Sequence, residues 1–218
     1  DEVDKEFMES LQKQGLEFKL SHKVISTKVS KSGVEVIMQS SDKKEVKEKY
    51  EIVLMSVGRK PNTEGLNLEK IGVKLTKNKS IEIGKDFKTS VEGIYAIGDV
   101  VPGPMLAHKA EEEGVACVEM LKGQKTHLNY DTIPAIVYTN PEVASVGKTE
   151  SQLKEAEVDY KVGKFPFMAN GRALTTSSSE GFVKILADSE TDQILGAHII
   201  GHDAGQLIAE TVSLIGDK

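Results

Sequence analysis

The sequence predicts an α/β region followed by an α+β module. Short apolar runs of strand length, such as residues 81–83 and 94–97, alternate with helical periodicity in the first part of the chain. From about residue 128 onwards, strands are interspersed with short helices, which is typical of an α+β module. Here we expect extended pieces at residues 158–162 and 165–167, a hairpin-like pair at residues 182–186 and 194–200, and a capping box from Thr149 to Gln152 that opens a short helix. We therefore expect three parts, at residues 1–57, 58–127 and 128–218.

Composition excludes several functional classes. The 218 residues carry a formal net charge of −6, which disfavours nucleic acid as a partner because nucleic-acid binding needs a basic face. No apolar run approaches the ~18 residues of a membrane-spanning helix, so we expect no membrane partner. Cys117 is the single cysteine, and we expect it to be a small buried hydrophobic residue. The chain does not begin with Met, and we expect it to be a partial sequence.

The first 57 residues are expected to form a helix, a hairpin and a further strand. Val3, Phe7 and Leu11 recur at helical spacing. Two segments with alternating apolar and polar side chains then predict the hairpin, and a compact apolar strand is expected to end at Gly58. The expected strands are residues 23–30, 34–40 and 50–57, and the expected turns are residues 31–33 and 41–49.

The most informative stretch is an expected strand, a tight turn and a helix. The apolar residues 94–97 lead into Gly98 and Asp99, and a helix is expected from near Met105 to about Lys122. Asp99 follows the strand where open α/β sheets place ligand-contacting groups. The first amides of the helix can face an anion or a developing negative charge. This combination suits a flavin, although a lone Gly-Asp pair is more often an ordinary turn.

The string Gly-Pro-Met-Leu-Ala-His-Lys-Ala-Glu at residues 103–111 resembles a flavin-contacting segment. The resemblance is to the two-dinucleotide-binding disulfide oxidoreductases and, among them, to the dihydrolipoamide dehydrogenase family. It implies that Asp99 binds the ribityl chain of FAD. It also implies that four residues contact the flavin, largely through their backbone: Met105, Leu106, Ala107 and His108.

The remaining parts resemble other domains of the same family. Residues 1–57 resemble the distal part of its NAD-binding domain, which implies that Val24 lies near the NAD adenosine and that Gly58 lets the backbone approach this cofactor. On their own residue types, Val24 could be a core residue and Gly58 could simply end a strand. Residues 128–218 resemble the interface domain through which this family forms homodimers, so the implied fold is a partial two-dinucleotide-binding fold followed by a dimerisation domain.

The resemblance implies one reaction. Dihydrolipoamide reduces an active-site disulfide, the electrons pass to FAD, and a hydride leaves to NAD⁺. It implies the E2 subunit of 2-oxo acid dehydrogenase complexes as a partner and the mitochondrial matrix as the location, with the cytoplasm as the alternative. However, the sequence has no Cys-x-x-x-x-Cys, Gly-rich dinucleotide turn or His-x-His-Pro string. We therefore assign no catalytic residue and expect this piece alone to be inactive and unstable.

Other polar residues are given structural roles. His198 and His202 are four residues apart but lie at an expected strand end, so no metal site is expected. Arg172 and Lys184 are expected to be interface or surface charges, and residues 111–113 are expected to complement the helix dipole.

Two other functions stay open. The chain could be a non-catalytic dimerisation or binding module, because it lacks the electron-carrying residues of the family. It could also belong to a related disulfide reductase that acts on glutathione, mercuric ion or a pair of pyridine nucleotides. Residues 105–108 argue against the second alternative, since their resemblance is to the lipoamide enzymes.

Overall fold

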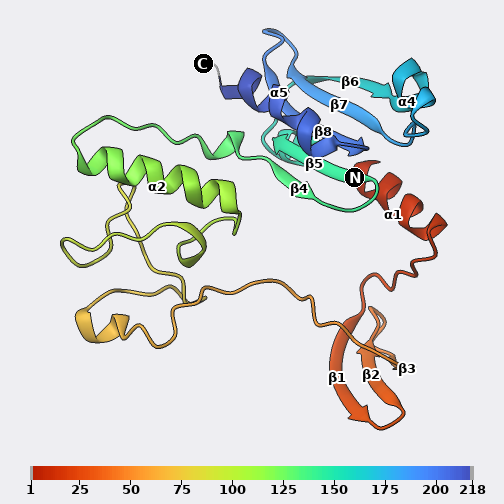
Figure 1. Cartoon of the computed structure of the whole chain (residues 1–218), viewed down its shortest axis with the longest axis horizontal. Helices are drawn as coiled ribbons and strands as arrows, with labels where there is room; N and C mark the ends of the chain where they lie inside the picture. The colour runs from red at the N-terminus through yellow and green to blue at the C-terminus, as the bar shows by residue number, and fades with distance from the viewer. Residues whose placement is uncertain (1, 217–218) are drawn as a thin grey trace. The chain divides into compact units, whose positions relative to one another are not determined.

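The computed structural model describes residues 2–216, which fold into two compact units (Figure 1). One unit combines the residues up to Ser10 with those from Lys60 onwards, and the other comprises Leu11–Arg59. Helix α1, Glu2–Lys13, therefore begins in the larger unit and ends in the smaller one. These units do not coincide with the three expected ranges, which stay a prediction.

The smaller unit is a three-stranded antiparallel sheet. Its strands are β1 (Lys23–Ser30), β2 (Gly33–Gln39) and β3 (Glu45–Tyr50), in the order β1-β2-β3. The predicted first hairpin is confirmed, since Ser30 pairs with Gly33 across the turn. The expected turn at residues 41–49 was too long, because β3 already begins at Glu45 and pairs along β2.

The expected apolar strand at residues 50–57 was wrong. Tyr50 ends β3, and the residues after it form a loop in which Ile52, Leu54 and Val57 are each 86% exposed. An apolar run is stable as a strand only where another strand bonds to its backbone and a second layer covers its side chains. Among residues 2–216, no strand bonds to the backbone of this run and no second layer covers its side chains.

A five-stranded antiparallel sheet dominates the larger unit. The strand order is β4-β5-β8-β7-β6, so the predicted hairpin of the last two strands in the sequence is confirmed at its centre. The bounds are Ala135–Val137 for β4, Glu142–Gly147 for β5, Tyr160–Pro166 for β6, Phe182–Asp188 for β7 and Ile194–Gly201 for β8. The two extended pieces expected at residues 158–162 and 165–167 are thus one strand followed by the 3₁₀ turn η4, Phe167–Ala169.

Helices cover both faces of this sheet. Helix α5, Ala204–Gly216, packs over β5 and β8 on a core that includes Ala144, Ala197 and Ile208. Val3 in the first turn of α1 packs with Phe182 and Ile200, whose side chains point away from α5 because strand residues alternate between faces. The predicted Thr149 capping box is confirmed at the start of α3, Glu150–Glu155, and the small helix α4 spans Gly171–Thr175.

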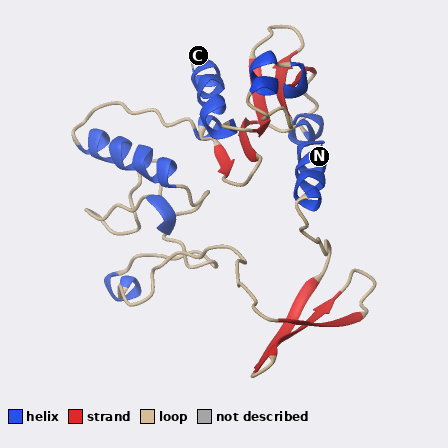
Figure 2. Cartoon of the chain, turned by 45° about the vertical axis from the view of Figure 1, so that its right-hand side comes forward, coloured by secondary structure: helices blue, strands red, loops and turns tan. Residues whose placement is uncertain are grey.

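The middle of the chain is mostly loop, as Figure 2 shows for the stretch between β3 and α2. Residues 81–83 and 94–97 were expected to be strands, but they make only the isolated bridges Leu75–Ile81 and Lys88–Tyr95. Their apolar side chains still fill a core with Val73 and Val101, which explains the apolar runs. The regular elements here are the 3₁₀ turns η1 (Leu68–Ile71), η2 (Gly98–Val100) and η3 (Tyr130–Thr132) and the helix α2 (Ala107–Leu121).

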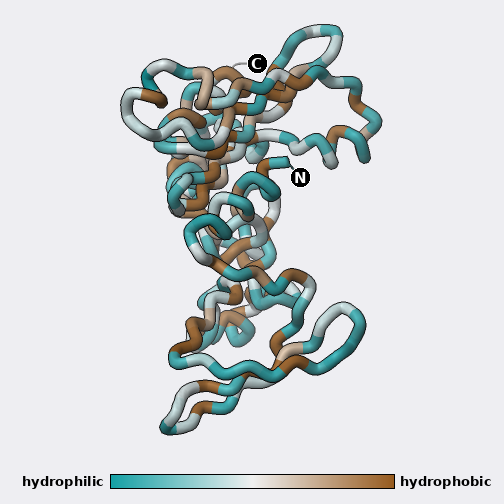
Figure 3. Tube along the Cα trace, turned by 90° about the vertical axis from the view of Figure 1, so that its right-hand side faces the viewer, coloured by the Kyte–Doolittle hydropathy of each residue, from teal (hydrophilic) through white to brown (hydrophobic). Residues whose placement is uncertain are grey.

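Hydrophobic and hydrophilic residues alternate over short distances along the trace (Figure 3). In the part of the chain that the structure describes, no helix is long and apolar enough to cross a bilayer. Cys117 lies inside α2 against Phe87 and Ala116, as predicted, and burial raises the pKa of its thiol. A raised pKa leaves Cys117 protonated and poorly nucleophilic at neutral pH.

Candidate functional site

The predicted flavin-contacting segment is a turn followed by the uncapped N-terminus of a helix. Asp99 lies in η2 and is partly buried. Helix α2 begins at Ala107, two residues later than expected, because Pro104 holds the chain extended and Leu106 is the N-cap residue. No side chain caps this end, and the first intrahelical bond runs from the Ala110 amide to the Leu106 carbonyl. The amides of the first turn therefore remain available to a ligand.

The five residues expected to contact FAD lie in this one segment. Met105 and Leu106 are partly buried in the extended stretch before α2, and Ala107 is exposed as its first residue. His108 is partly buried, and its Nε2 lies 2.7 Å from the Pro134 carbonyl oxygen. A carbonyl oxygen can only accept, so Nε2 carries the hydrogen and the orientation of the ring is fixed.

Gly98 allows the turn to approach α2. Its φ of +74° favours glycine, and a Cβ built there would lie 3.2 Å from the Ala110 Cβ. Among the described residues, the close neighbour that this glycine admits is the helix α2. The glycine thus sets the spacing between Asp99 and the first turn of α2.

A buried ion pair lies behind this turn. Lys109 and Glu113 are 0% and 1% exposed, and their Nζ and Oε2 atoms are 3.1 Å apart. The Gly98 amide donates to Glu113 Oε2 at 2.6 Å, and Lys109 Nζ donates to the Gly98 carbonyl at 3.0 Å. The Tyr130 hydroxyl donates to the other carboxylate oxygen of Glu113 at 2.8 Å.

The role expected for Glu113 was incomplete. Glu111 and Glu112 are exposed, in keeping with a solvated acidic face, but Glu113 is a buried acceptor. The spacing of Lys109, Glu113 and Cys117 at i, i+4 and i+8 could have placed the pair on the buried face of α2. Partial burial, together with the bond to Glu113, raises the pKa of Tyr130 to about 12.

The two residues expected to contact NAD lie in the smaller unit. Val24 is in β1, pairs with Met38 and is 53% exposed, so it is not a core residue. Gly58 lies in a loop with a φ of +109°, and a Cβ there would meet no atom within 4 Å. Neither residue therefore has a packing role among the described residues.

A row of polar side chains crosses the sheet under α1 and α3. Lys184 was expected at the surface or an interface but is only 4% exposed, with Nζ 3.3 Å from Glu2 Oε2 and 3.0 Å from Glu150 Oε1. Burial opposes its charge, but Glu150 and Glu2 outweigh it and hold the pKa of Lys184 above its usual value. Arg172, by contrast, is exposed on α4.

His198 pairs with Lys184 on one side and Ser145 on the other in the sheet register. Its Nε2 lies 3.0 Å from the Lys148 carbonyl, and its Nδ1 lies 3.0 Å from the Ser145 hydroxyl. Burial, with a smaller contribution from Lys184, lowers the pKa of His198. Both ring nitrogens are thus occupied, and the described residues contain no group of three or more side chains that could hold a metal ion.

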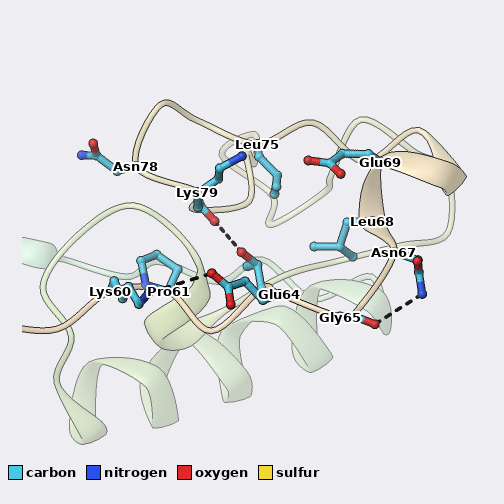
Figure 4. A pocket seen from close by; sticks show the side chains of 11 residues that line it. Lys60, Pro61, Glu64, Gly65, Asn67, Leu68, Glu69, Leu75, Asn78 and Lys79 are labelled. Carbon is cyan, nitrogen blue, oxygen red and sulfur yellow. Dashed lines mark hydrogen bonds and ion pairs between the residues drawn. The ribbon is translucent and has the colours of Figure 1, made fainter.

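A separate cavity of about 390 Å³ lies in the loops that follow the smaller unit (Figure 4). Its wall is held by the Thr63 hydroxyl, which donates to the Lys79 carbonyl at 2.9 Å, and by the exposed ion pair of Lys60 and Glu64. None of the expected cofactor-contacting residues lines it.

Comparison with known families defines the class of protein. Residues 1–114 match the family described as pyridine nucleotide-disulphide oxidoreductase, and residues 133–217 match the dimerisation domain of that family. The chain belongs to the pyridine nucleotide-disulphide oxidoreductase family. Its predicted fold class, a partial dinucleotide-binding fold followed by a dimerisation domain, is confirmed.

Within this family the chain is similar to dihydrolipoyl dehydrogenases. It is 55% identical over 210 residues to the mitochondrial dihydrolipoyl dehydrogenase of Pisum sativum, and 54% identical over 210 residues to a leghemoglobin reductase of Glycine max. These matches cover 96% of this chain but only 42% and 40% of the relatives, so the chain spans less than half of their length. The resemblance found in the sequence is confirmed.

Solved structures agree with this assignment. LpdA from Mycobacterium tuberculosis superposes with a TM-score of 0.86 at 28% identity, over 97% of this chain and 45% of LpdA. The flavoprotein disulfide reductase RclA from Escherichia coli superposes with a TM-score of 0.88 at 24% identity, over 99% of this chain and 49% of RclA, which shows a shared fold.

Proposed function

We propose that the chain forms part of an FAD-dependent enzyme that oxidises dihydrolipoamide with NAD⁺. Asp99 and the segment from Met105 to His108 contact FAD, and Val24 and Gly58 contact NAD⁺. The observation that carries the proposal is the arrangement of η2 and α2, where a carboxylate and an uncapped helix N-terminus share one rigid segment. The 55% identity to the pea enzyme supports the same conclusion.

The residues present fit a flavin. A carboxylate such as Asp99 accepts hydrogen bonds from ribityl hydroxyls, and the α2 N-terminus offers amides and a positive dipole end to negative charge. Bound FAD supplies the transfer of electrons between thiols and a nicotinamide. His108 holds one side of the segment through the Pro134 carbonyl. The chain has one cysteine, so the redox disulfide is not formed within it.

The partners follow from the same proposal. A homodimer is supported by the match of residues 133–217 to the dimerisation domain of the family. The mitochondrial matrix is supported by the mitochondrial names of relatives from pea and Arabidopsis thaliana. The E2 subunit of a 2-oxo acid dehydrogenase complex then supplies the dihydrolipoamide.

A chimera tests the proposed reaction. This chain replaces the matching 210 residues of the pea relative, and NAD⁺ reduction is measured with dihydrolipoamide. The proposal predicts turnover within about tenfold of the pea enzyme, since 55% of the replaced residues are identical. A folded, flavin-loaded chimera that reduces no NAD⁺ with dihydrolipoamide would contradict it. Parallel assays with glutathione and leghemoglobin examine the alternative substrates.

A non-catalytic dimerisation module is the second candidate. The observation in its favour is that the five-stranded sheet has its own core with α5. Sedimentation and FAD titration of the chain alone distinguish the two. Dimers with no flavin uptake, together with an inactive chimera, would favour the module.

A further inference from the structure

We propose that Lys109 and Glu113 are positioning residues for the cofactor, which hold the Gly98 turn and the first turn of α2 in the geometry that contacts flavin. This inference rests on the proposed function, because it assigns a role to residues behind the same site. Neither side chain is exposed enough to touch the cofactor directly.

The pair binds both polar groups of Gly98. Glu113 Oε2 accepts from the Gly98 amide at 2.6 Å and from Lys109 Nζ at 3.1 Å, while Nζ donates to the Gly98 carbonyl at 3.0 Å. The two peptide groups on either side of the Gly98 Cα are therefore held, one at its N–H and the other at its C=O, and neither can rotate without breaking a charge-assisted bond. The direction in which Asp99 leaves the turn is therefore set by a pair on α2.

The loop between the turn and the helix passes against Lys109. A Cβ built at Gly103 would lie 3.6 Å from the Lys109 Cε. The lysine side chain thus lies against the loop that leads to Met105. Holding this loop closed keeps the extended residues before α2 next to η2.

Two further bonds tie the helix to the segment 129–134. The Tyr130 hydroxyl donates to Glu113, and His108 bonds to the Pro134 carbonyl. The segment 129–134 therefore holds α2 at two places, at His108 near its first residue and at Glu113 more than one turn further on. Replacement of a buried ion pair by apolar groups is often neutral for stability, so stability alone does not account for the pair. The hydrogen bonds fix the orientation of the peptide groups at Gly98, which apolar packing alone does not do.

The test compares the full chain with the double variant K109M/E113M, which removes both charges and the hydrogen bonds that the pair makes to Gly98. K5M/E9M is the matched control, because Lys5 and Glu9 form an exposed pair at the same i, i+4 spacing. L153A is the control for general destabilisation, since Leu153 is buried in α3 away from the segment. The measurements are hydrogen exchange of the Gly98 amide by NMR and titration of FAD by fluorescence quenching.

We expect Gly98 exchange to accelerate by about tenfold or more in K109M/E113M and not in either control. We also expect FAD to bind about tenfold more weakly to this variant, because misplacement of contacts by less than about 1 Å has effects of this size. A variant that keeps wild-type Gly98 protection, or that binds FAD as the wild type does, overturns the inference. If the wild-type chain alone takes up no FAD, the same variants are compared in the chimera with the pea relative, where an unchanged FAD content would overturn the inference. A wild-type chimera that is folded but holds no FAD would instead contradict the proposed function.

Discussion

Gly98 shows how one residue type fixes the spacing of the candidate site. Its φ of +74° lies in the left-handed region, and a Cβ added there would lie nearest to the Ala110 Cβ, at 3.2 Å. Two separate costs therefore act on any replacement: the left-handed backbone and the contact with α2. Only the second cost is specific to the proposed flavin-contacting segment.

Replacement of Gly98 by alanine should destabilise the chain by more than the left-handed backbone alone. The backbone accounts for about 1–2 kcal/mol, and displacement of the turn from α2 adds to it. Gly123 is the matched control, since its φ is +80° and a Cβ there meets nothing within 4 Å. Urea unfolding of G98A and G123A measures the difference. Equal losses of stability would show that the approach to Ala110 is unimportant.

A linear string was enough to propose Asp99 and the residues 105–108 as flavin contacts, which stays a prediction, whereas the residues that support this segment could not be predicted from it. Lys109 and Glu113 bond to Gly98 and Tyr130, which lie 11 to 17 residues away, and no local pattern reports such partners. The i, i+4 spacing indicates that Lys109 and Glu113 lie on one face of α2, but it does not name their partners, and an acidic run next to a lysine more often lies in solvent.

At the scale of elements, a polar row joins three strands and two helices. His198 of β8 lies between Ser145 of β5 and Lys184 of β7, and Lys184 reaches Glu2 in α1 and Glu150 in α3. Because these groups are satisfied by one another, the helices are docked on the sheet by charge as well as by apolar packing.

This row predicts that stability falls with mild acid. The pKa of His198 is lowered below its usual 6.5, so the folded chain binds fewer protons than the unfolded chain just below that pH. The free energy of unfolding should therefore decrease as pH falls from about 7.5 to 5.5, by no more than about 1.4 kcal/mol for each pH unit.

Urea unfolding of wild type and H198N over this range checks the prediction. The carboxyls of Glu2 and Glu150 have lowered pKa values, so they titrate below this window. The variant should lose most of the slope. A wild-type chain whose stability is flat from about pH 7.5 to 5.5 would refute the assignment of His198.

Elements whose sequence pattern lies within a few neighbouring residues were predicted correctly. The Thr149 capping box, the turn before Gly33 and the hairpin of β7 and β8 depend on residues close in sequence. The expected strands at residues 50–57 and 94–97 failed because an apolar run shows only that burial is favourable. Whether it becomes a strand depends on partners, which the run itself does not specify.

At the scale of the whole molecule, the two units differ in how much they bury. In the smaller unit Val36 and Met38 are buried, but all eight residues of β1 are exposed. In the larger unit Leu186, Ile199 and Ile200 are 2% exposed or less. A sheet with one covered strand gains little from burial, so its backbone bonds should open more often.

Hydrogen exchange on the isolated chain should therefore show two levels of protection. Amides of β2 should exchange at least about tenfold faster than those of β8, although both are central strands with two neighbours. Uniform protection across the two units would mean that the smaller sheet is stabilised by contacts that its own burial does not account for.

The FAD content of the purified chimera with the pea relative decides whether the segment from Asp99 to His108 holds the flavin. We predict about one FAD per chain for the wild-type segment and for D86A, whose Asp86 forms a half-exposed pair with Lys88. D99A should retain at least about tenfold less, because the ribityl chain loses its acceptor. A D99A chimera that is folded and holds as much FAD as the wild type would contradict the assignment of this segment to the flavin.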